Sequence, residues 1–525
     1  AWCSRSNCSL LDLGRFCQLV GCSRTFRTSV VIDLTTLTDG YSLLLRWDIF
    51  AAIAGGMVFG LLIGVIPGMT AALGLAILLP LTFVMESITA LVLLTSVYTG
   101  SLTGGGILAI LINTPGTPGA VATTFDGYPM ARQGKQNEAL GLQIMASIVG
   151  GILSYLTLLI IIQPLAHFAL QFGPSEILAL TIFVIVVIGV LVGEAFLRAL
   201  FAGFLGLMAS TIGTSVATGT ARGTFGLIEL EDGLPLILCI IGMFAIPEMI
   251  SLTTRKTISS VEMAHGHNFK RLLSGALQAL RSQFVLLRSS AIGIAIGVLP
   301  AAGATLASLL SYSIAKRQAK PGQKFGSGEP EGVIAAESAN NASEGGAMAI
   351  LLALGIPGSA STAVILGGFM LHGLVPGPGL FRDNGPLVYG LILANILQMV
   401  LLGAFALGIA YSVARVVRVP TQILLPALVV LISLGAFSFR NLWIDVVILF
   451  SFGFLGYVLR RYNFAPIAFM IGLFLGRPLD EEMTRFNALF GDDLSRVFDR
   501  PITMGLVTLT LISIIFQVRK SFRRQ

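Results

Sequence analysis

The chain has 525 residues, of which 55% are hydrophobic and only 11% are charged. A water-soluble protein of this size could not bury so much apolar surface, so the composition excludes a soluble globular protein. The formal net charge is +7. This excess does not indicate a nucleic-acid partner, because the Lys and Arg residues of a membrane protein gather in loops that face the cytoplasm.

Continuous apolar runs predict membrane-spanning helices. A helix needs about 20 predominantly apolar residues to cross a bilayer, and runs close to this length recur between Ile49 and Phe516. Shorter runs, broken by Gly and Pro, are expected to be re-entrant or discontinuous. A membrane β-barrel would instead alternate apolar and polar residues. We therefore predict an all-α integral membrane protein with about 11 to 14 transmembrane or re-entrant helices.

The two ends of the chain and its middle differ from the apolar runs. Residues 1–45 contain four of the five cysteines but no His, no Cys-x-x-Cys pair and no long apolar run, so we predict an extension of doubtful role. The linker 251–283 and the tail of segment 501–525, after a last transmembrane helix, are basic and are predicted to be cytoplasmic. Their basic residues include Arg255, Lys256, Lys270, Arg271 and Arg281 in the linker, and Arg519, Lys520, Arg523 and Arg524 in the tail.

Two blocks of sequence occur twice. Segment 64–67 (Gly-Val-Ile-Pro) returns as 297–300 (Gly-Val-Leu-Pro), and segment 98–116 aligns without gaps on 340–358. The offsets, 233 (64 to 297) and 242 (98 to 340), differ because the polar loop 316–331 is longer in the second copy. We therefore predict two membrane repeats, 46–250 and 284–500.

The charges of equivalent loops indicate how the repeats are oriented. Loop 316–331 carries four Lys and Arg residues, whereas its counterpart at 83–87 carries none. Equivalent loops would then face opposite sides of the membrane, which is typical of inverted-topology repeats with broken helices at the midplane.

Pro and Gly interrupt both repeats at equivalent positions. Broken backbone persists in a membrane only where it is buried in protein or lines a cavity, and a helix that begins after the break would direct its free N–H groups at an anion. The alternative is a pair of Pro kinks that only ease helix packing. The predicted substrate-binding residues are Asn113, Thr114, Pro115, Gly116, Thr117, Gly355, Pro357, Gly358, Ser359 and Thr362, and the other helix-break residues are Pro67, Gly68, Pro300 and Gly303.

A polar row in the second repeat suggests a cation site. In a secondary transporter such a site would hold the coupling ion, whose gradient drives transport. Glu337, Asn340, Asn341 and Glu344 share one helical face, and such groups in membrane helices face the protein interior or a cavity. They suit Na⁺, or a carboxylate could carry H⁺; the alternative is hydrogen bonding between helices. The candidate coupling-ion or cavity-lining residues are Tyr98, Thr99, Ser101, Glu337, Ser338, Asn340, Asn341 and Glu344.

Several motifs of other protein classes are absent from the sequence. It has no Gly-x-x-x-x-Gly-Lys-Ser/Thr phosphate loop and no His-Glu-x-x-His pair. No His residue is accompanied in the sequence by a full set of other potential metal ligands at a metal-binding spacing. We therefore predict no enzyme activity, no metal site and no cofactor other than a coupling cation.

Five stretches, taken in order, resemble the large membrane subunit of the tripartite tricarboxylate transporters. Together they extend over nearly the whole chain beyond about Asp48. They are 60–68 with Pro80; 98–134; Thr218-Gly219 with Arg222 and Phe225-Gly226; 325–341; and 354–358 with 372–378. Two departures from that family are Ala at 301 and 302, where Gly is usual, and Ile350, where Pro is common.

The resemblance implies a multi-pass permease of the bacterial inner membrane. It would work with a small membrane subunit and a periplasmic solute-binding protein, and would take up citrate-like or other carboxylates on a cation gradient. The residues alone leave open a binding-protein-independent anion exchanger or channel, and a membrane-bound enzyme or scaffold.

Overall fold

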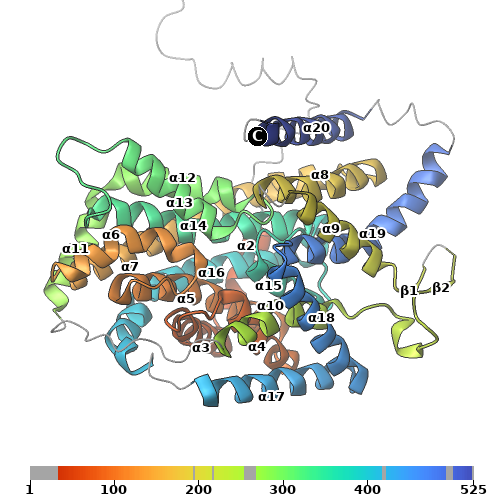
Figure 1. Cartoon of the computed structure of the whole chain (residues 1–525), viewed down its shortest axis with the longest axis horizontal. Helices are drawn as coiled ribbons and strands as arrows, with labels where there is room; N and C mark the ends of the chain where they lie inside the picture. The colour runs from red at the N-terminus through yellow and green to blue at the C-terminus, as the bar shows by residue number, and fades with distance from the viewer. Residues whose placement is uncertain are drawn as a thin grey trace, which may run out of the picture.

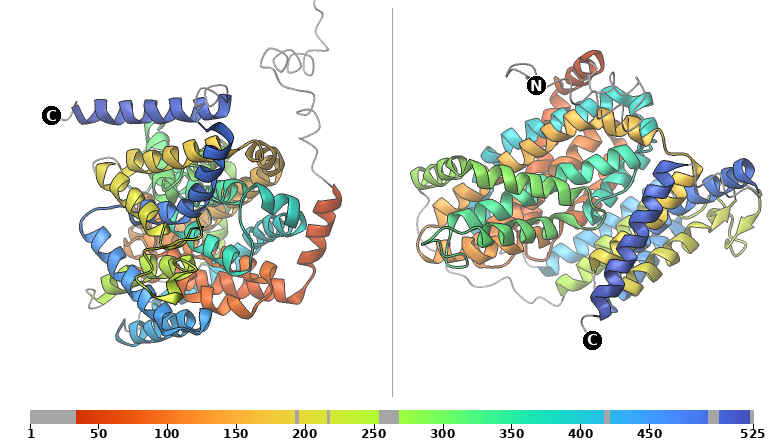
Figure 2. Two further views of the ribbon diagram at one scale, coloured as in Figure 1. Left: turned by 90° about the vertical axis from the view of Figure 1, so that its right-hand side faces the viewer. Right: turned by 90° about the horizontal axis from the view of Figure 1, so that it is seen from above.

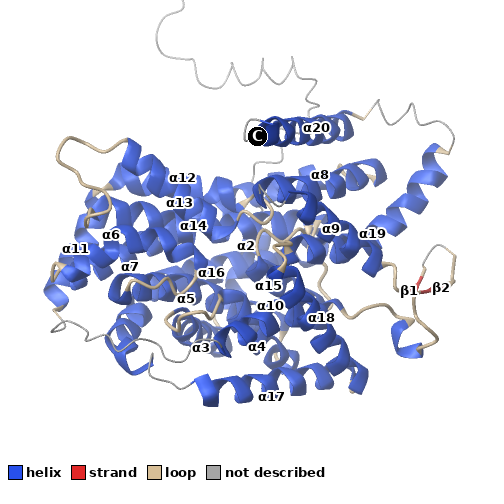
Figure 3. Cartoon of the chain, viewed as in Figure 1, coloured by secondary structure: helices blue, strands red, loops and turns tan. Residues whose placement is uncertain are grey.

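The computed structural model describes residues 34–192, 196–215, 218–253, 268–416, 421–491 and 500–522. This part of the chain is almost entirely helical, with one two-stranded hairpin (Figure 3). Residues 1–33 of the predicted extension, 254–267 of the linker and the tail beyond residue 522 lie outside the described residues.

The first half of the chain forms helices α2 to α10. Their bounds are α2 (Leu34–Leu44), α3 (Trp47–Gly64), α4 (Ala71–Leu78), η2 (Leu79–Val84), α5 (Ser87–Ile112), η3 (Pro118–Ala120), α6 (Val121–Arg132), α7 (Gln136–Ala169), α8 (Pro174–Val192), α9 (Phe196–Ser210) and α10 (Leu236–Thr253). Between α9 and α10 lie β1 (Gly213–Thr214), β2 (Ala221–Arg222) and η5 (Ile228–Leu230). The two strands pair antiparallel.

The second half forms helices α11 to α20. Their bounds are α11 (Phe269–Arg281), α12 (Gln283–Gly297), α13 (Gly303–Arg317), α14 (Pro330–Leu354), α15 (Ala360–Leu371), α16 (Pro378–Val416), α17 (Thr421–Arg440), α18 (Trp443–Arg461), α19 (Pro466–Phe490) and α20 (Pro501–Phe522). Helix α16 is kinked at Asn384, and α20 lies along the outside of the helical body, against α8 (Figure 2).

The helices confirm the predicted all-α membrane protein. In the described chain, seven are long and apolar enough to cross a bilayer, or eight if α11 and α12, which meet at a bend of 75°, form one broken span. Five shorter apolar helices accompany them. These segments together agree with the predicted range of about 11 to 14 transmembrane or re-entrant helices.

Small residues let the helices of each repeat pack closely, and they do so in the same way in both. A Cβ atom on Gly64 would collide with the carbonyl oxygen of Ser101, and one on Gly297 would collide with that of Ser343. Gly64 and Gly297 differ by 233 positions and Ser101 and Ser343 by 242, which are the two offsets found in the sequence. The contact of α3 with α5 is thus repeated by α12 with α14, and small residues at such interfaces are typical of membrane helices.

Contacts between the two halves are also repeated when each helix is replaced by its equivalent in the other repeat. Helix α2 packs on α16 and α11 packs on α7, while α9 packs on α19 and α18 packs on α10. These contacts match α2 to α11, α7 to α16, α9 to α18 and α10 to α19. The repeat boundaries at 46–250 and 284–500 remain predictions.

Helices α5 and α14 lie side by side in the interior of the molecule and run in opposite directions where they meet. Thr99 bonds Glu344, whereas Thr103, one turn later in α5, bonds Asn341, almost one turn earlier in α14. Both helices are buried along almost their whole length. Equivalent helices that cross antiparallel are the arrangement expected of inverted repeats.

Candidate functional site

The two acidic residues of α14 are fully buried and are held by donors from the first repeat. Glu344 accepts hydrogen bonds from Thr99 Oγ1 and Tyr155 OH, both at 2.7 Å. Glu337 accepts from Thr123, and from Ser147 Oγ at 3.2 Å and Gln143 Nε2 at 3.4 Å. Among the described residues, no Lys or Arg forms an ion pair with either carboxylate.

Several oxygen atoms of the two central helices and of the first break are buried without a hydrogen-bond partner in the described structure. Leaving such a group unpaired costs about 1 to 3 kcal/mol, and a bound ion or water commonly accounts for it in a native protein. Oxygen ligands of this kind suit hard cations better than transition metals. The atoms are Ser101 Oγ, Thr117 Oγ1, Asn340 Oδ1, Asn341 Oδ1 and Glu344 Oε2.

The two predicted substrate segments are real breaks with matching backbone conformations. Asn113 ends α5 with φ 55° and Gly355 ends α14 with φ 72°, at positions that differ by 242. Gly116 is buried against Gly64 and Gly105, and its N–H bonds the carbonyl oxygen of Gly105 at 3.3 Å. Thr114 and Pro115 are partly buried.

The second break packs like the first, but its polar groups are used differently. Gly358 is buried against Gly297 and Ala347, and Pro357 is buried as well. Ser359 and Thr362 form a capping box in which each side chain bonds the other's backbone N–H. At the equivalent position of the first break, the Thr117 hydroxyl has no partner.

Each break reaches the central helix of the other repeat. Ser359 Oγ lies 3.4 Å from Tyr98 OH in α5, and Gly119 lies against the amide oxygen of Asn340 in α14. Tyr98 and Asn340 occupy equivalent positions, so the two breaks flank the α5–α14 crossing on opposite sides.

The other two helix breaks bend the chain after α3 and α12. Pro67 and Pro300 are buried, and the next residues, Gly68 and Ala301, are equivalent and have φ values of 87° and 61°. An L-residue in this left-handed conformation is unfavourable by about 1 to 2 kcal/mol. Gly303 also has a positive φ, of 60°.

Ser338 lies apart from the unpaired oxygens. Its hydroxyl is 2.8 Å from Ser290 Oγ and bonds the carbonyl oxygen of Leu286 at 3.2 Å, so it faces α12 of its own repeat. These contacts point to a role in helix packing, and the assignment of Ser338 to the coupling-ion or cavity-lining residues remains a prediction.

Sequence reasoning missed the donors on α6 and α7. Gln143 and Ser147 stand four residues apart on one face of α7, and Tyr155 follows two turns later; this polar row in an apolar helix was the available signal. Thr123 of α6 carried no such signal. Gln398 of α16 was also missed; it donates to Thr99 Oγ1 at 2.8 Å and extends the network.

Asp126 is buried within α6. Its Oδ1 accepts the backbone N–H groups of Gly326, Gly328 and Glu329, each at 2.8 Å. Its Oδ2 accepts from Tyr312 OH at 2.8 Å. Asp126 thus joins the first repeat to the loop that precedes α14.

The family model described as "Tripartite tricarboxylate transporter TctA family" matches residues 50–471. The chain belongs to this family. The matched region includes both breaks and the whole α5–α14 crossing. Membership in the TctA family confirms the resemblance found in the sequence and identifies the chain as a transporter component.

Two proteins of Agrobacterium vitis are similar to this chain. An "Uncharacterized 52.8 kDa protein in TAR-I ttuC' 3'region" is 33% identical over 468 residues, which cover 89% of this chain and 93% of that protein. An "Uncharacterized protein in TAR-II ttuC' 3'region" is 35% identical over 231 residues, 44% of this chain and 96% of that protein. No solved structure matches the chain significantly.

Proposed function

We propose that the chain is the large membrane subunit of a tripartite secondary transporter in the bacterial inner membrane. It takes up tricarboxylates or other small carboxylates, delivered by a periplasmic solute-binding protein, together with Na⁺ or H⁺, and it acts with a small membrane subunit. The TctA family match supports the transporter class, and the sequence has no phosphate-binding loop for ATP.

The observation that carries the proposal is the set of unpaired oxygens at the centre of the α5–α14 crossing. Glu344 Oε2 and the side-chain oxygens of Asn340 and Asn341 have no hydrogen-bond partner in the described structure, and they are oxygen ligands of the kind that a small hard cation prefers. A cation bound to Glu344 would compensate its buried negative charge. A proton on the carboxylate would compensate the same charge.

The carboxylate substrate is assigned to the two breaks. Helices α6 and α15 begin after them, and the positive ends of their dipoles favour an anion. Since the breaks flank the proposed cation site on opposite sides, a cation bound there would attract the substrate, which gives a physical basis for coupled uptake.

The test is uptake by proteoliposomes that contain the chain, its small subunit and the solute-binding protein. Labelled di- and tricarboxylates are expected to accumulate only under an imposed Na⁺ or H⁺ gradient. Flux that persists without the soluble protein and without a gradient would favour an anion exchanger or channel. Substrate turnover without translocation would instead identify an enzyme.

A further inference from the structure

One motif of the sequence, Thr218-Gly219 with Arg222 and Phe225-Gly226, takes no part in the α5–α14 crossing. It belongs to the segment between α9 and α10, whose strands β1 and β2 form a hairpin at the edge of the helical body (Figure 1). The described part of this segment is too polar and too short to span a bilayer.

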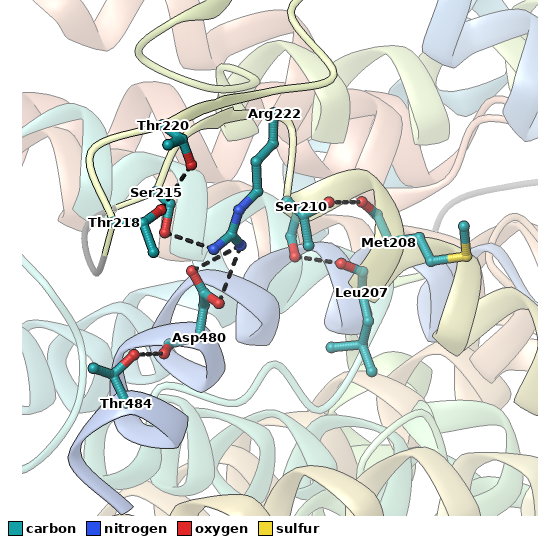
Figure 4. A network of polar contacts seen from close by, with 10 residues as sticks. Leu207, Met208, Ser210, Ser215, Thr218, Thr220, Arg222, Asp480 and Thr484 are labelled. Atoms are coloured by element: carbon teal, nitrogen blue, oxygen red, sulfur yellow. Dashed lines mark hydrogen bonds and ion pairs between the residues drawn. The ribbon is translucent and has the colours of Figure 1, made fainter. Parts of the chain in front are cut away.

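Polar contacts hold the base of this hairpin in a defined shape (Figure 4). Arg222 Nη1 lies 3.2 Å from both carboxylate oxygens of Asp480 on α19, and Nη2 donates to Ser215 Oγ at 2.7 Å. The Thr214 N–H bonds the carbonyl oxygen of Glu231 at 2.8 Å. The hairpin and α19 therefore form one folded unit.

The part of the segment after β2, residues 223–230, presents apolar side chains outward. Phe225 is 89% exposed and Ile228 is 74% exposed. Phe225 also has a positive φ of 51°, an unfavourable conformation for an aromatic residue. Glu231 and Asp232 are exposed directly beside them. Apolar side chains rimmed by charged ones mark an interaction surface.

The basic segments determine which side of the membrane this surface faces. Helix α10 crosses from the hairpin to the linker 251–283, whose Lys and Arg residues assign it to the cytoplasm. Helix α18 runs parallel to α10: Arg440, just before it, bonds the carbonyl oxygen of Glu229, and Arg460 near its end pairs with Glu248. Its basic end thus also lies on the linker side, so the hairpin lies on the opposite, outer side.

We propose that residues 223–232 form the docking surface for the solute-binding protein, an inference that rests on the proposed function. Four features favour a soluble protein as the occupant. The surface lies on the side from which substrate arrives, it is outside the apolar spans, its base is fixed by Arg222 and Asp480, and its acidic rim would favour a partner with a basic patch.

The direct experiment measures binding of the purified, carboxylate-loaded solute-binding protein to the chain in lipid nanodiscs. Phe225→Asn tolerates the positive φ and is expected to weaken binding by about tenfold or more, as removal of an aromatic anchor does. The matched control is Phe269→Asn. Phe269 is 57% exposed but lies at the start of α11 on the linker side, so binding is expected to stay at the wild-type level.

A second measurement tests whether the surface enters the outer leaflet instead. Phe225→Trp adds an indole to the three tryptophans of the chain, and its additional emission is followed in vesicles of brominated phosphatidylcholine. A blue shift on addition of the solute-binding protein, without quenching by the lipid, supports docking. Quenching by the lipid, with no response to the protein, overturns it.

The failure of this inference is distinguishable from that of the proposed function. If the wild-type chain neither binds a solute-binding protein nor needs one for uptake, the proposed function itself fails. If wild type and Phe225→Asn bind equally well while uptake requires the soluble protein, the partner exists but docks elsewhere.

Discussion

Helices α5 and α14 are equivalent in fold, but only α14 carries acidic side chains. Both are buried and both end in a left-handed residue before a Pro-Gly break. Yet the positions of α5 that correspond to Glu337 and Glu344 are Thr95 and Leu102. One repeat supplies the carboxylates, and the other supplies the hydroxyl and amide donors that hold them. The two equivalent helices therefore differ in the chemistry that they bring to their contact.

The largest effect is expected from removing a charge that only α14 carries. Glu344→Gln should lower the apparent affinity for the coupling cation by about 100-fold or more, because unit charges about 4 Å apart interact by roughly 4 kcal/mol at an effective dielectric constant of about 20. If H⁺ is the coupling ion, the pH dependence of uptake should flatten instead. Uptake by proteoliposomes at graded cation concentration and pH measures both.

Glu331→Gln is the matched control for that variant, since Glu331 lies in the first turn of the same helix and outside the crossing. Unchanged cation dependence in Glu344→Gln would show that the asymmetry between α5 and α14 is structural only.

Neighbouring residues of α14 should separate function from packing. Asn340→Ala is expected to reduce uptake by about tenfold with little change in melting temperature, because its Oδ1 has no hydrogen-bond partner to lose. Ser338→Ala should do the reverse, lowering stability by about 1 kcal/mol while uptake persists. Uptake and thermal unfolding of the detergent-solubilised protein test both. Equal loss of uptake in the two variants would contradict the placement of Ser338 outside the site.

Variants of the two breaks should likewise separate an effect on stability from an effect on substrate binding. Ser359→Ala removes a capping hydroxyl and should cost about 1 kcal/mol of stability. Thr117→Val, at the equivalent position, removes a hydroxyl without a partner and should change substrate affinity more than stability. Competition for labelled carboxylate, measured beside unfolding, distinguishes them, and a larger stability loss in Thr117→Val would mean that its hydroxyl is engaged after all.

The smallest effect concerns the bends after α3 and α12. Ala301→Gly should raise stability by about 1 kcal/mol, since it relieves a positive φ that Gly68 already accommodates in the other repeat. Gly68→Ala should lose a similar amount. Thermal unfolding of both variants tests the pair; if Ala301→Gly is destabilising, the methyl group of Ala301 makes a compensating contact.

The repeats could be predicted from the sequence because both copies need glycine at the positions where two helices approach closely. The same glycines therefore recur at the same spacing in both copies. Gly64 and Gly297 needed no knowledge of the fold to be matched. The polar row from Glu337 to Glu344 was visible for a similar reason, since such groups are rare in apolar helices.

The partners of those residues could not be derived in the same way. Thr123 and Tyr155 reach α14 only because α6 and α7 pack against it, and nothing in their local sequence specifies that contact. Likewise, the different fates of Ser338 and Asn340 depend on the rotation of α14 against α12, which residue type alone does not reveal.

The carboxylate of Asp126 has a consequence for how the two halves of the gene can evolve. The loop it binds through Gly326, Gly328 and Glu329 belongs to the stretch whose extra length makes the two copies unequal. A protein assembled from two identical first halves would have the carboxylate twice and this loop not at all. The inserted residues therefore make the pairing of the two halves unequal, because two copies of the first half would lack all three of these hydrogen bonds.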